Sequence, residues 1–196
     1  QKAKTQLGLD ERPLVVSFWG SLGAREMNKM IARFMKDNVD AGLPFQHIHS
    51  AGSFGWKWMP EYVKEQGVDL NSTPAIDMRE FIYDMPNVMA AADLVICRAG
   101  AATIAEVAAA GKPAIFVPSP NVTDNHQEKN ARIIEHQGGA VVLREDECSG
   151  DILFDTAKGL LEDTERLQKM RRAAETLAVP DSSERILNIM MELMKQ

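Results

Sequence analysis

The sequence predicts an α/β fold in which helices cover both faces of a doubly wound parallel sheet of about six strands. Short apolar runs of strand length alternate with longer segments in which apolar residues recur at helical spacing. The run at 94–97 is apolar throughout, as is typical of a parallel strand buried on both faces. Glycine turns follow the runs at 14–19 and 94–97, which is the arrangement of Rossmann-like nucleotide-binding sheets.

Length and composition restrict the class of protein. With 196 residues, the chain is long enough for one large domain and too short for two of ordinary size. The net charge of −6 argues against a general nucleic-acid binder. The sequence shows no apolar run near the ~20 residues that span a bilayer and no secretory signal pattern. Cys97 and Cys148 form neither a metal spacing nor a disulfide framework, so we expect a cytoplasmic protein.

The predicted elements follow one another in regular order, and Gly, Pro and Asp mark most of their ends. We expect residues 1–13 to be a linker remnant and 14–196 to form one domain. The predicted strands cover 14–19, 45–49, 73–77, 94–97, 114–117 and 140–143. The predicted helices cover 3–9, 24–36, 56–67, 85–92 with Asp84 as its cap, 102–110, 127–136, 151–161, 164–177, and 183–195 with Asp181 or Ser182 as its cap.

The last predicted helix is unusual because it is apolar over more than one face. A helix on the surface of a globular domain shows a narrower apolar stripe. We therefore expect the helix at 183–195 to pack against a second domain or subunit.

Two of the strand-to-helix turns consist of small residues. The first turn is Gly20-Ser21-Leu22-Gly23, and the second is Arg98-Ala99-Gly100-Ala101. The N–H groups that open the following helix are free, and together with the helix dipole they favour a phosphate. A G-x-x-G pattern alone is a weak signal, because a plain tight turn also explains it.

Glu106 lies one turn into the helix that follows the second turn. A carboxylate repels a diphosphate, but it accepts two hydrogen bonds from a ribose diol, as acidic residues do in dinucleotide folds. The alternative interpretation is a favourable charge near the start of a helix.

Two further groups of side chains have more ordinary explanations. His47 and His49 share one face of a predicted strand, and two histidines without a third ligand make a poor metal site. The aromatic residues Trp56, Trp58 and Tyr62 form a ligand wall, a partner surface or, as is more common, part of the core.

The central stretch of the chain resembles the donor-binding domain of MurG-type glycosyltransferases. These enzymes transfer N-acetylglucosamine from UDP-N-acetylglucosamine to a lipid-linked muramyl-pentapeptide in peptidoglycan synthesis. The resemblance covers nearly the whole chain, with several motifs in the same order. It is carried by RAGAATIAE at 98–106, GKP at 111–113, DNHQEKNA at 124–131, SFWGSLGAR at 17–25 and FIYDM at 81–85.

The resemblance implies the C-terminal half of a two-domain GT-B glycosyltransferase, together with a set of donor-binding residues. Ser21, Gly20 and Gly23 would face the diphosphate, and Ala102 and Thr103 would donate to it. Glu106 would take the ribose hydroxyls. The backbone of Ile82 would pair with uracil in a slot formed by Phe81 and Met85. His126 and Gln127 would reach the sugar, with Asn130 supporting their loop.

The resemblance also implies what lies outside these residues. It implies inverting displacement at the anomeric carbon without a metal or other cofactor, and no catalytic residue in this chain. The general base would belong to an N-terminal acceptor domain that this chain lacks, and that domain would meet the membrane-bound lipid acceptor. The full-length protein would work at the cytoplasmic face of the plasma membrane, and the isolated domain would be inactive.

One departure from the family pattern and two alternative functions stay open. Trp19 stands where the family usually has a glycine, so its indole either narrows the phosphate site or points into the sheet. The alternatives are a non-catalytic nucleotide-sugar-binding subunit and another GT-B enzyme, such as a UDP-N-acetylglucosamine epimerase.

Overall fold

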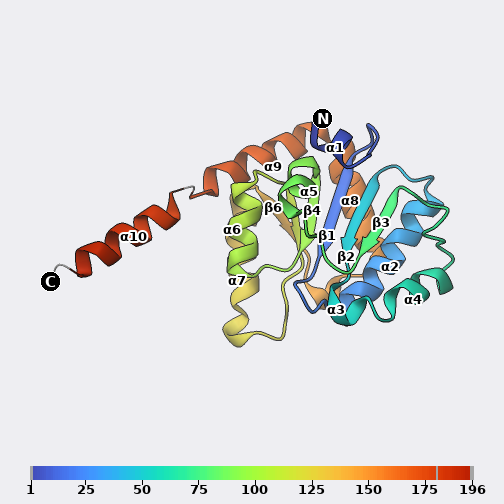
Figure 1. Ribbon diagram of the computed structural model, residues 1–196, viewed down its shortest axis with the longest axis horizontal. Helices are drawn as coiled ribbons and strands as arrows, with labels where there is room; N and C mark the ends of the chain where they lie inside the picture. The colour runs from blue at the N-terminus through green and yellow to red at the C-terminus, as the bar shows by residue number, and fades with distance from the viewer. Residues whose placement is uncertain (1, 180, 195–196) are drawn as a thin grey trace.

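The computed structural model describes residues 2–179 and 181–194. In this part of the chain, six strands form one parallel sheet in the order β3-β2-β1-β4-β5-β6 (Figure 1). The predicted α/β class, with a doubly wound sheet, is therefore confirmed. The strands are β1 (Leu14–Phe18), β2 (Gln46–Ser50), β3 (Ile76–Arg79), β4 (Leu94–Cys97), β5 (Ala114–Phe116) and β6 (Ala140–Val142).

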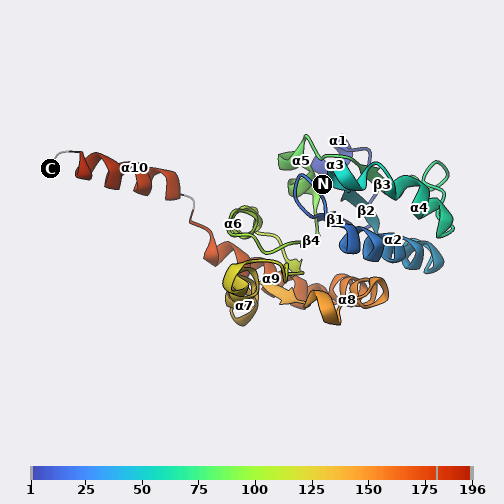
Figure 2. The same cartoon turned by 90° about the horizontal axis from the view of Figure 1, so that it is seen from below.

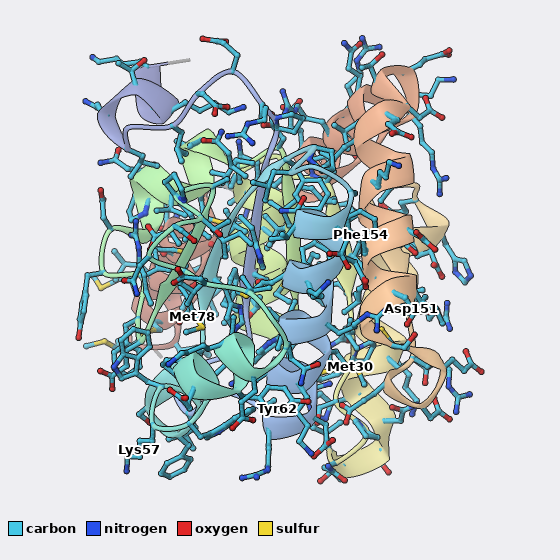
Figure 3. All side chains as sticks on the ribbon, turned by 90° about the vertical axis from the view of Figure 1, so that its right-hand side faces the viewer. Met30, Lys57, Tyr62, Met78, Asp151 and Phe154 are labelled. Atoms are coloured by element: carbon cyan, nitrogen blue, oxygen red, sulfur yellow. The ribbon has the colours of Figure 1, made fainter. Side chains whose placement is uncertain are left out.

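One helical layer covers the first face of the sheet. It contains α2 (Arg25–Asp40), α4 (Met59–Glu65), α8 (Gly150–Glu162) and part of α9 (Thr164–Leu177). Figure 3 views the molecule from the right-hand side of Figure 1, and Phe154 of α8 lies beside α2. The ring of Phe154 lies 6.1 Å from that of Phe34 and 5.8 Å from that of Phe45, so aromatic packing joins α8 to α2 and β2.

The opposite face carries the second layer, which is seen from below in Figure 2. Its core is formed by side chains of the sheet and of the helices that follow β3, β4 and β5. These helices are α5 (Met85–Ala91), α6 (Ala101–Ala109) and α7 (His126–His136), and α1 (Lys2–Gln6) packs beside α5.

Four predicted segments differ from the structure. The helix predicted at 3–9 ends at Gln6, because a turn through Leu7 and Gly8 follows it. Helix α2 extends to Asp40 because buried Asn38 and the turn at Gly42 carry it beyond the predicted end at residue 36. Strand β3 begins at Ile76 rather than at residue 73, because a turn from Thr73 to Ile76 precedes it. The predicted loop at 51–55 and helix at 56–67 are instead two short helices, α3 (Gly52–Gly55) and α4.

The predicted cap residues stand at the expected positions, but their side chains do not make the predicted capping hydrogen bonds. Asp84 and Asp181 stand at the N-cap positions of α5 and α10 (Ser182–Leu193), but among the described residues neither side chain caps its helix. The Asp84 carboxylate accepts from the side chain of Asn87, and Asp181 pairs with Arg185. An ordinary capping bond does occur at Asp163, which accepts from the backbone N–H of Arg166 at the start of α9.

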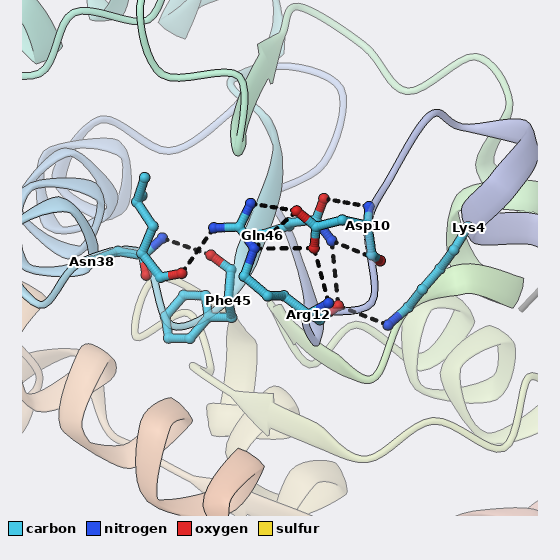
Figure 4. A network of polar contacts seen from close by, with 7 residues as sticks. Lys4, Asp10, Arg12, Asn38, Phe45 and Gln46 are labelled. Carbon is cyan, nitrogen blue, oxygen red and sulfur yellow. Dashed lines mark hydrogen bonds and ion pairs between the residues drawn. The ribbon is translucent and has the colours of Figure 1, made fainter.

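The segment before β1 is tied to the start of β2 by polar contacts (Figure 4). The side-chain amide of Gln46 accepts from the backbone N–H of Asp10 at 3.0 Å and donates to the carbonyl of Arg12 at 3.3 Å. Arg12 donates to the carbonyl of Leu43, and Lys4 donates to that of Arg12. The prediction of a linker remnant at 1–13 stays a prediction.

Helix α10 projects away from the rest of the domain (Figure 1), and every residue of it is exposed. Its exposed apolar side chains include Ile186, Leu187, Ile189 and Met190. The expectation that this helix packs on a second domain or subunit stays a prediction. No helix of the described residues is long and apolar enough to cross a membrane.

We predict that deleting residues 182–196 leaves the stability of the domain unchanged. Because α10 buries nothing against the sheet, its loss should change the free energy of unfolding by less than about 0.5 kcal/mol, the range of surface changes. Urea unfolding of the two chains measures this, and a lower midpoint in the shortened chain would show that α10 packs on the domain in solution.

Candidate functional site

The candidate site lies between β1 and β4, where the order in which successive strands join the sheet reverses. These two strands are neighbours, with Phe18 in register with Cys97. After β1 the chain turns into α2 on one face, and after β4 it turns into α6 on the other. The two turns therefore flank a crevice at the carboxyl ends of the strands, the usual ligand position in open α/β sheets.

The first turn, Gly20 to Gly23, is shaped by its glycines. Both have positive φ angles, of 84° and 78°, which other residues adopt only with strain. A Cβ on Gly23 would lie 2.1 Å from the carbonyl oxygen of Ala51, so the backbone approaches too closely for any side chain. Ser21 is exposed at this turn, and its carbonyl accepts from the N–H of Ser53 at 3.0 Å.

The second turn leads into α6 through Gly100, which stands at the N-cap position. Among the described residues, no side chain caps this helix start. The N–H groups around exposed Ala102 and half-buried Thr103 are therefore available to a ligand at the positive end of the helix dipole. Such a helix start favours an anion.

A cavity of about 630 Å³ opens between α5 and α6 and contains two of the predicted residues, Met85 and Glu106. Apolar side chains, among them Phe18 and Met89, form most of its lining, and Glu106 supplies a carboxylate. This combination suits a ligand with a flat apolar part and hydroxyl groups. Phe81 and Ile82 precede α5, but among the described residues they do not line this cavity.

Lys112 forms part of the same cavity. Its ammonium donates to the carbonyls of Ala90 and Ala92 at 3.0 and 2.9 Å, so it satisfies carbonyls at the end of α5. Burial lowers the pKa of Lys112. The bonds join the end of α6 to the end of α5 and fix one end of the cavity.

A second cavity, of about 410 Å³, joins the first turn to the loops after β4 and β5. Its lining includes Gly23, Arg98, Ser119 and Gln127. The side-chain carbonyl of Gln127 accepts from the N–H groups of Ala99 at 3.3 Å and Ser119 at 3.0 Å, and so holds two loops together.

The other two residues predicted near the sugar also belong to α7. His126 is exposed at the helix start, and its Nδ1 lies 2.9 Å from the carbonyl oxygen of Thr123. Asn130 is half-buried one turn later. The structure therefore gathers Gly23 and Gln127 in one cavity, Met85 and Glu106 in another, and leaves His126 at the surface.

Trp19 occupies the position that departs from the family pattern. It is only 5% exposed and packs in the core beneath α2, while it also lines the second cavity. The guanidinium of Arg98 lies 6.0 Å from the centre of its ring. The indole is therefore mainly a core residue and forms part of the cavity wall.

Comparison with known proteins decides the family. Residues 14–186 match the glycosyltransferase family 28 C-terminal domain. The chain belongs to this family. The resemblance derived from the sequence motifs is thereby confirmed, and the chain is hereafter called the family 28 domain.

Two curated relatives are transferases that share one name. They are a UDP-N-acetylglucosamine–N-acetylmuramyl-(pentapeptide) pyrophosphoryl-undecaprenol N-acetylglucosamine transferase from Acetivibrio thermocellus and one from Bacillus cytotoxicus. The first is 39% identical over 196 residues, which are 100% of this chain and 52% of the relative. The second is 36% identical over 200 residues, with the same two coverages. The family 28 domain thus spans about half the length of these relatives.

Solved structures share the fold. The crystal structure of Acinetobacter baumannii MurG matches 97% of this chain and 53% of its own, with a TM-score of 0.77 and 26% identity. A Staphylococcus aureus MnaA–UDP structure matches with a TM-score of 0.70 at 14% identity, and a Listeria monocytogenes putative UDP-N-acetylglucosamine 2-epimerase with 0.69 at 16%. At such identities the last two show the fold alone. The prediction of a GT-B C-terminal half is confirmed by the MurG likeness.

Arg98, to which the sequence motifs assign no role beyond its place in the second turn, lines the second cavity. Arg98 donates to the carbonyls of Val117 and Pro118, both at 3.1 Å, and pairs with Glu145 at 2.5 Å. It therefore ties the ends of β4, β5 and β6 together. Its position directly after β4 was the available signal, but an arginine in a turn has many ordinary roles.

His47 and His49 are fully buried in the family 28 domain and both contact Ser17 of β1. The Ser17 hydroxyl lies 2.7 Å from His47 Nε2 and 2.7 Å from His49 Nδ1. Burial lowers the pKa of His49 to about 3 and that of His47 well below its usual value. In residues 2–179 and 181–194, no group of three or more His, Cys, Asp or Glu is arranged to hold a metal ion.

We predict that these histidines make the domain less stable as the pH is lowered below 6.5, at pH values well above those at which carboxylates titrate. Their pKa is near 6.5 in the unfolded chain and much lower in the folded one, so only the unfolded state gains their protons between pH 6.5 and 5. Each should remove up to about 1.4 kcal/mol of unfolding free energy per pH unit there. Urea unfolding at several pH values measures the slope.

The matched control replaces the exposed histidines His126 and His136 by glutamine, which should leave this slope unchanged. His49→Gln should reduce it. A wild-type slope of zero between pH 6.5 and 5 would contradict the burial of neutral imidazoles.

Proposed function

We propose that this family 28 domain binds UDP-N-acetylglucosamine as the donor half of a glycosyltransferase. The acceptor would be a lipid-linked muramyl-pentapeptide. The observation that carries this proposal is the placement of Glu106, in an apolar cavity, one turn beyond a helix start with available N–H groups. This combination suits a nucleoside diphosphate. The base fits an apolar slot, the ribose hydroxyls need a hydrogen-bond acceptor, and the phosphates need N–H donors.

The uridine would lie against α5 and α6. Its ribose hydroxyls donate to the carboxylate of Glu106, and Met85 provides apolar contact. The backbone of Ile82, with Phe81 beside it, pairs with the edge of the uracil ring. Phe81 is half-buried next to exposed Tyr83, and the centres of their rings lie 5.9 Å apart. The likeness to MurG-type relatives is the support for these base contacts.

The diphosphate would lie between the two turns. Gly20, Ser21 and Gly23 present backbone from one side of the crevice, and Ala102 and Thr103 present N–H groups from the other. Thr103 adds a hydroxyl that lies 3.9 Å from the position of a Cβ on Gly100, at the mouth of the turn. When the sugar departs, charge grows on the diphosphate, and preorganised N–H donors stabilise it without a metal.

The N-acetylglucosamine ring would extend toward the start of α7. His126 reaches its hydroxyls from the surface, and Gln127 and Asn130 shape the loop from which His126 extends. Displacement at the anomeric carbon would invert its configuration. The general base would come from the N-terminal half present in the longer relatives, so the domain alone would bind the donor and not transfer it.

The names of the relatives support the proposed acceptor, and the MurG-type resemblance supports the proposed location. The domain would work with an acceptor-binding half, and through it with a membrane-bound lipid acceptor at the cytoplasmic face of the plasma membrane. A nucleotide-sugar-binding subunit without catalysis would use the same contacts, and turnover after addition of an acceptor half distinguishes the two.

We predict that Glu106→Gln weakens UDP binding by about 1.5–3 kcal/mol, because a charged hydrogen-bond acceptor for the ribose diol is lost. Calorimetric titration measures this with UDP and with 2′,3′-dideoxy-UDP. The difference in affinity between the wild-type and Glu106→Gln chains should nearly disappear with the dideoxy ligand, because this ligand has no ribose hydroxyl groups to donate to either side chain.

Glu165→Gln, an exposed change on α9, is the control and should leave both affinities unchanged. An equal loss for UDP and dideoxy-UDP in Glu106→Gln would remove the ribose role of Glu106 and leave only an electrostatic effect on the helix.

We predict that His126→Ala weakens UDP-N-acetylglucosamine binding by about 1 kcal/mol, the net contribution of one hydrogen bond, and leaves UDP binding intact. Gln127→Ala should instead weaken both ligands, since the Gln127 carbonyl joins the loops after β4 and β5. Gln127→Glu keeps the acceptor oxygen and is the conservative control. Equal losses of UDP and UDP-sugar affinity in His126→Ala would exclude sugar contact by His126.

A further inference from the structure

A chain of buried hydrogen bonds runs beneath the first glycine turn, from β2 through β1 to α2. Its members are His47, Ser17, His49 and Asn28, and each side chain is fully buried. The Ser17 hydroxyl bonds both histidines, and His49 Nε2 lies 3.2 Å from Asn28 Oδ1. The amide of Asn28 then donates to the carbonyl of Ala51 at 2.9 Å.

The direction of this chain can be assigned from its last bond. Because the amide nitrogen of Asn28 donates to Ala51, its oxygen must accept, so His49 Nε2 carries the proton. His49 Nδ1 is then the acceptor for the Ser17 hydroxyl, which in turn accepts from His47 Nε2. Every bond of the chain therefore has one donor and one acceptor, and its outermost acceptor is the carbonyl of Ala51.

Ala51 begins a segment that contacts the candidate site on two sides. On one side its carbonyl fills the space where Gly23 would carry a Cβ, and Ser53 and Phe54 donate to the carbonyls of Ser21 and Leu22 at 3.0 and 3.3 Å. On the other side, the N–H groups of Ala51 and Gly52 donate to the carbonyls of Arg79 and Glu80, which lead toward α5.

We infer that Asn28 and His49 are positioning residues for the donor diphosphate. They fix the carbonyl of Ala51 and thus the segment 51–54, and this segment holds the Gly20–Gly23 turn in the shape that a diphosphate needs. The inference rests on the proposed donor-binding function and assigns part of that binding to side chains that touch no ligand.

The same helix provides a matched control. Asn38 of α2 is also fully buried, and its amide likewise donates to one backbone carbonyl, that of Phe45, at 3.1 Å. Phe45 precedes β2, at the opposite edge of the sheet from the glycine turns. Asn28→Leu and Asn38→Leu therefore each remove one side-chain bond to a backbone carbonyl, at the two ends of one helix, and Asn28→Leu also removes the bond to His49.

The test compares the dissociation constants of UDP and uridine for both variants by calorimetric titration. Asn28→Leu should weaken UDP by about tenfold and change uridine by less than about twofold. Asn38→Leu should lower the thermal midpoint in a similar way and change neither ligand by more than about twofold. Equal losses of UDP and uridine in Asn28→Leu, or a selective UDP loss in Asn38→Leu, would overturn the inference.

A milder variant covers the case in which Asn28→Leu does not fold. Ser17→Ala removes only the hydroxyl that links the two histidines, and it should weaken UDP selectively by about threefold. A folded Ser17→Ala variant with unchanged UDP affinity would overturn the inference.

Amide hydrogen exchange separates this inference from the proposed function. The N–H groups of Ser53 and Phe54 should exchange at least about tenfold faster in the folded Asn28 or Ser17 variant and at the wild-type rate in Asn38→Leu. If the wild-type chain binds no UDP, the donor-binding function fails, and the exchange rates alone decide whether the buried chain positions the turn. Unchanged exchange at both amides would overturn it.

Discussion

The pairing of β1 with β4 is the constraint on which the candidate site depends. It places Phe18 beside Cys97, so the two strands end at the same level and the strand-to-helix turns that follow them lie side by side. Because α2 and α6 leave toward opposite faces of the sheet, the turns diverge and leave a crevice between them. Gly23 and Gln127 line one cavity near this crevice, and Met85 and Glu106 line another.

Backbone groups provide much of this candidate site, and side chains hold them in place. Gln127 joins two loops, Arg98 ties three strand ends, and Lys112 fixes the end of α5. Asn28 supports the segment against which Gly23 packs. A site of this kind gains its affinity from preorganised N–H groups, and substitutions of residues that never contact a ligand can weaken binding.

The sequence predicted the parts of this structure that depend on local pattern. Apolar runs and glycine turns identified the six strands, the two turns and the position of Glu106. Sequence reasoning placed β3 too early and missed α3, because the pairing of Ile76 with His47 and the contact of Gly52 with Gly23 are long-range. The sequence shows that the histidine pair is a poor metal site, but it does not predict the hydrogen bonds of the pair, because the partners Ser17 and Asn28 lie on other elements. The apolar residues of α10 predict that the helix packs on something, but they do not specify its partner, and in this structure the helix is exposed.

The most direct test of the proposed donor site is calorimetric titration of the domain with UDP-N-acetylglucosamine, UDP-glucose and UDP in the absence of metal. If the start of α7 contacts the sugar as proposed, all three ligands bind and UDP-N-acetylglucosamine binds more tightly than UDP-glucose. If none of the three ligands binds, the two turns and the Glu106 cavity do not form a donor site in this domain.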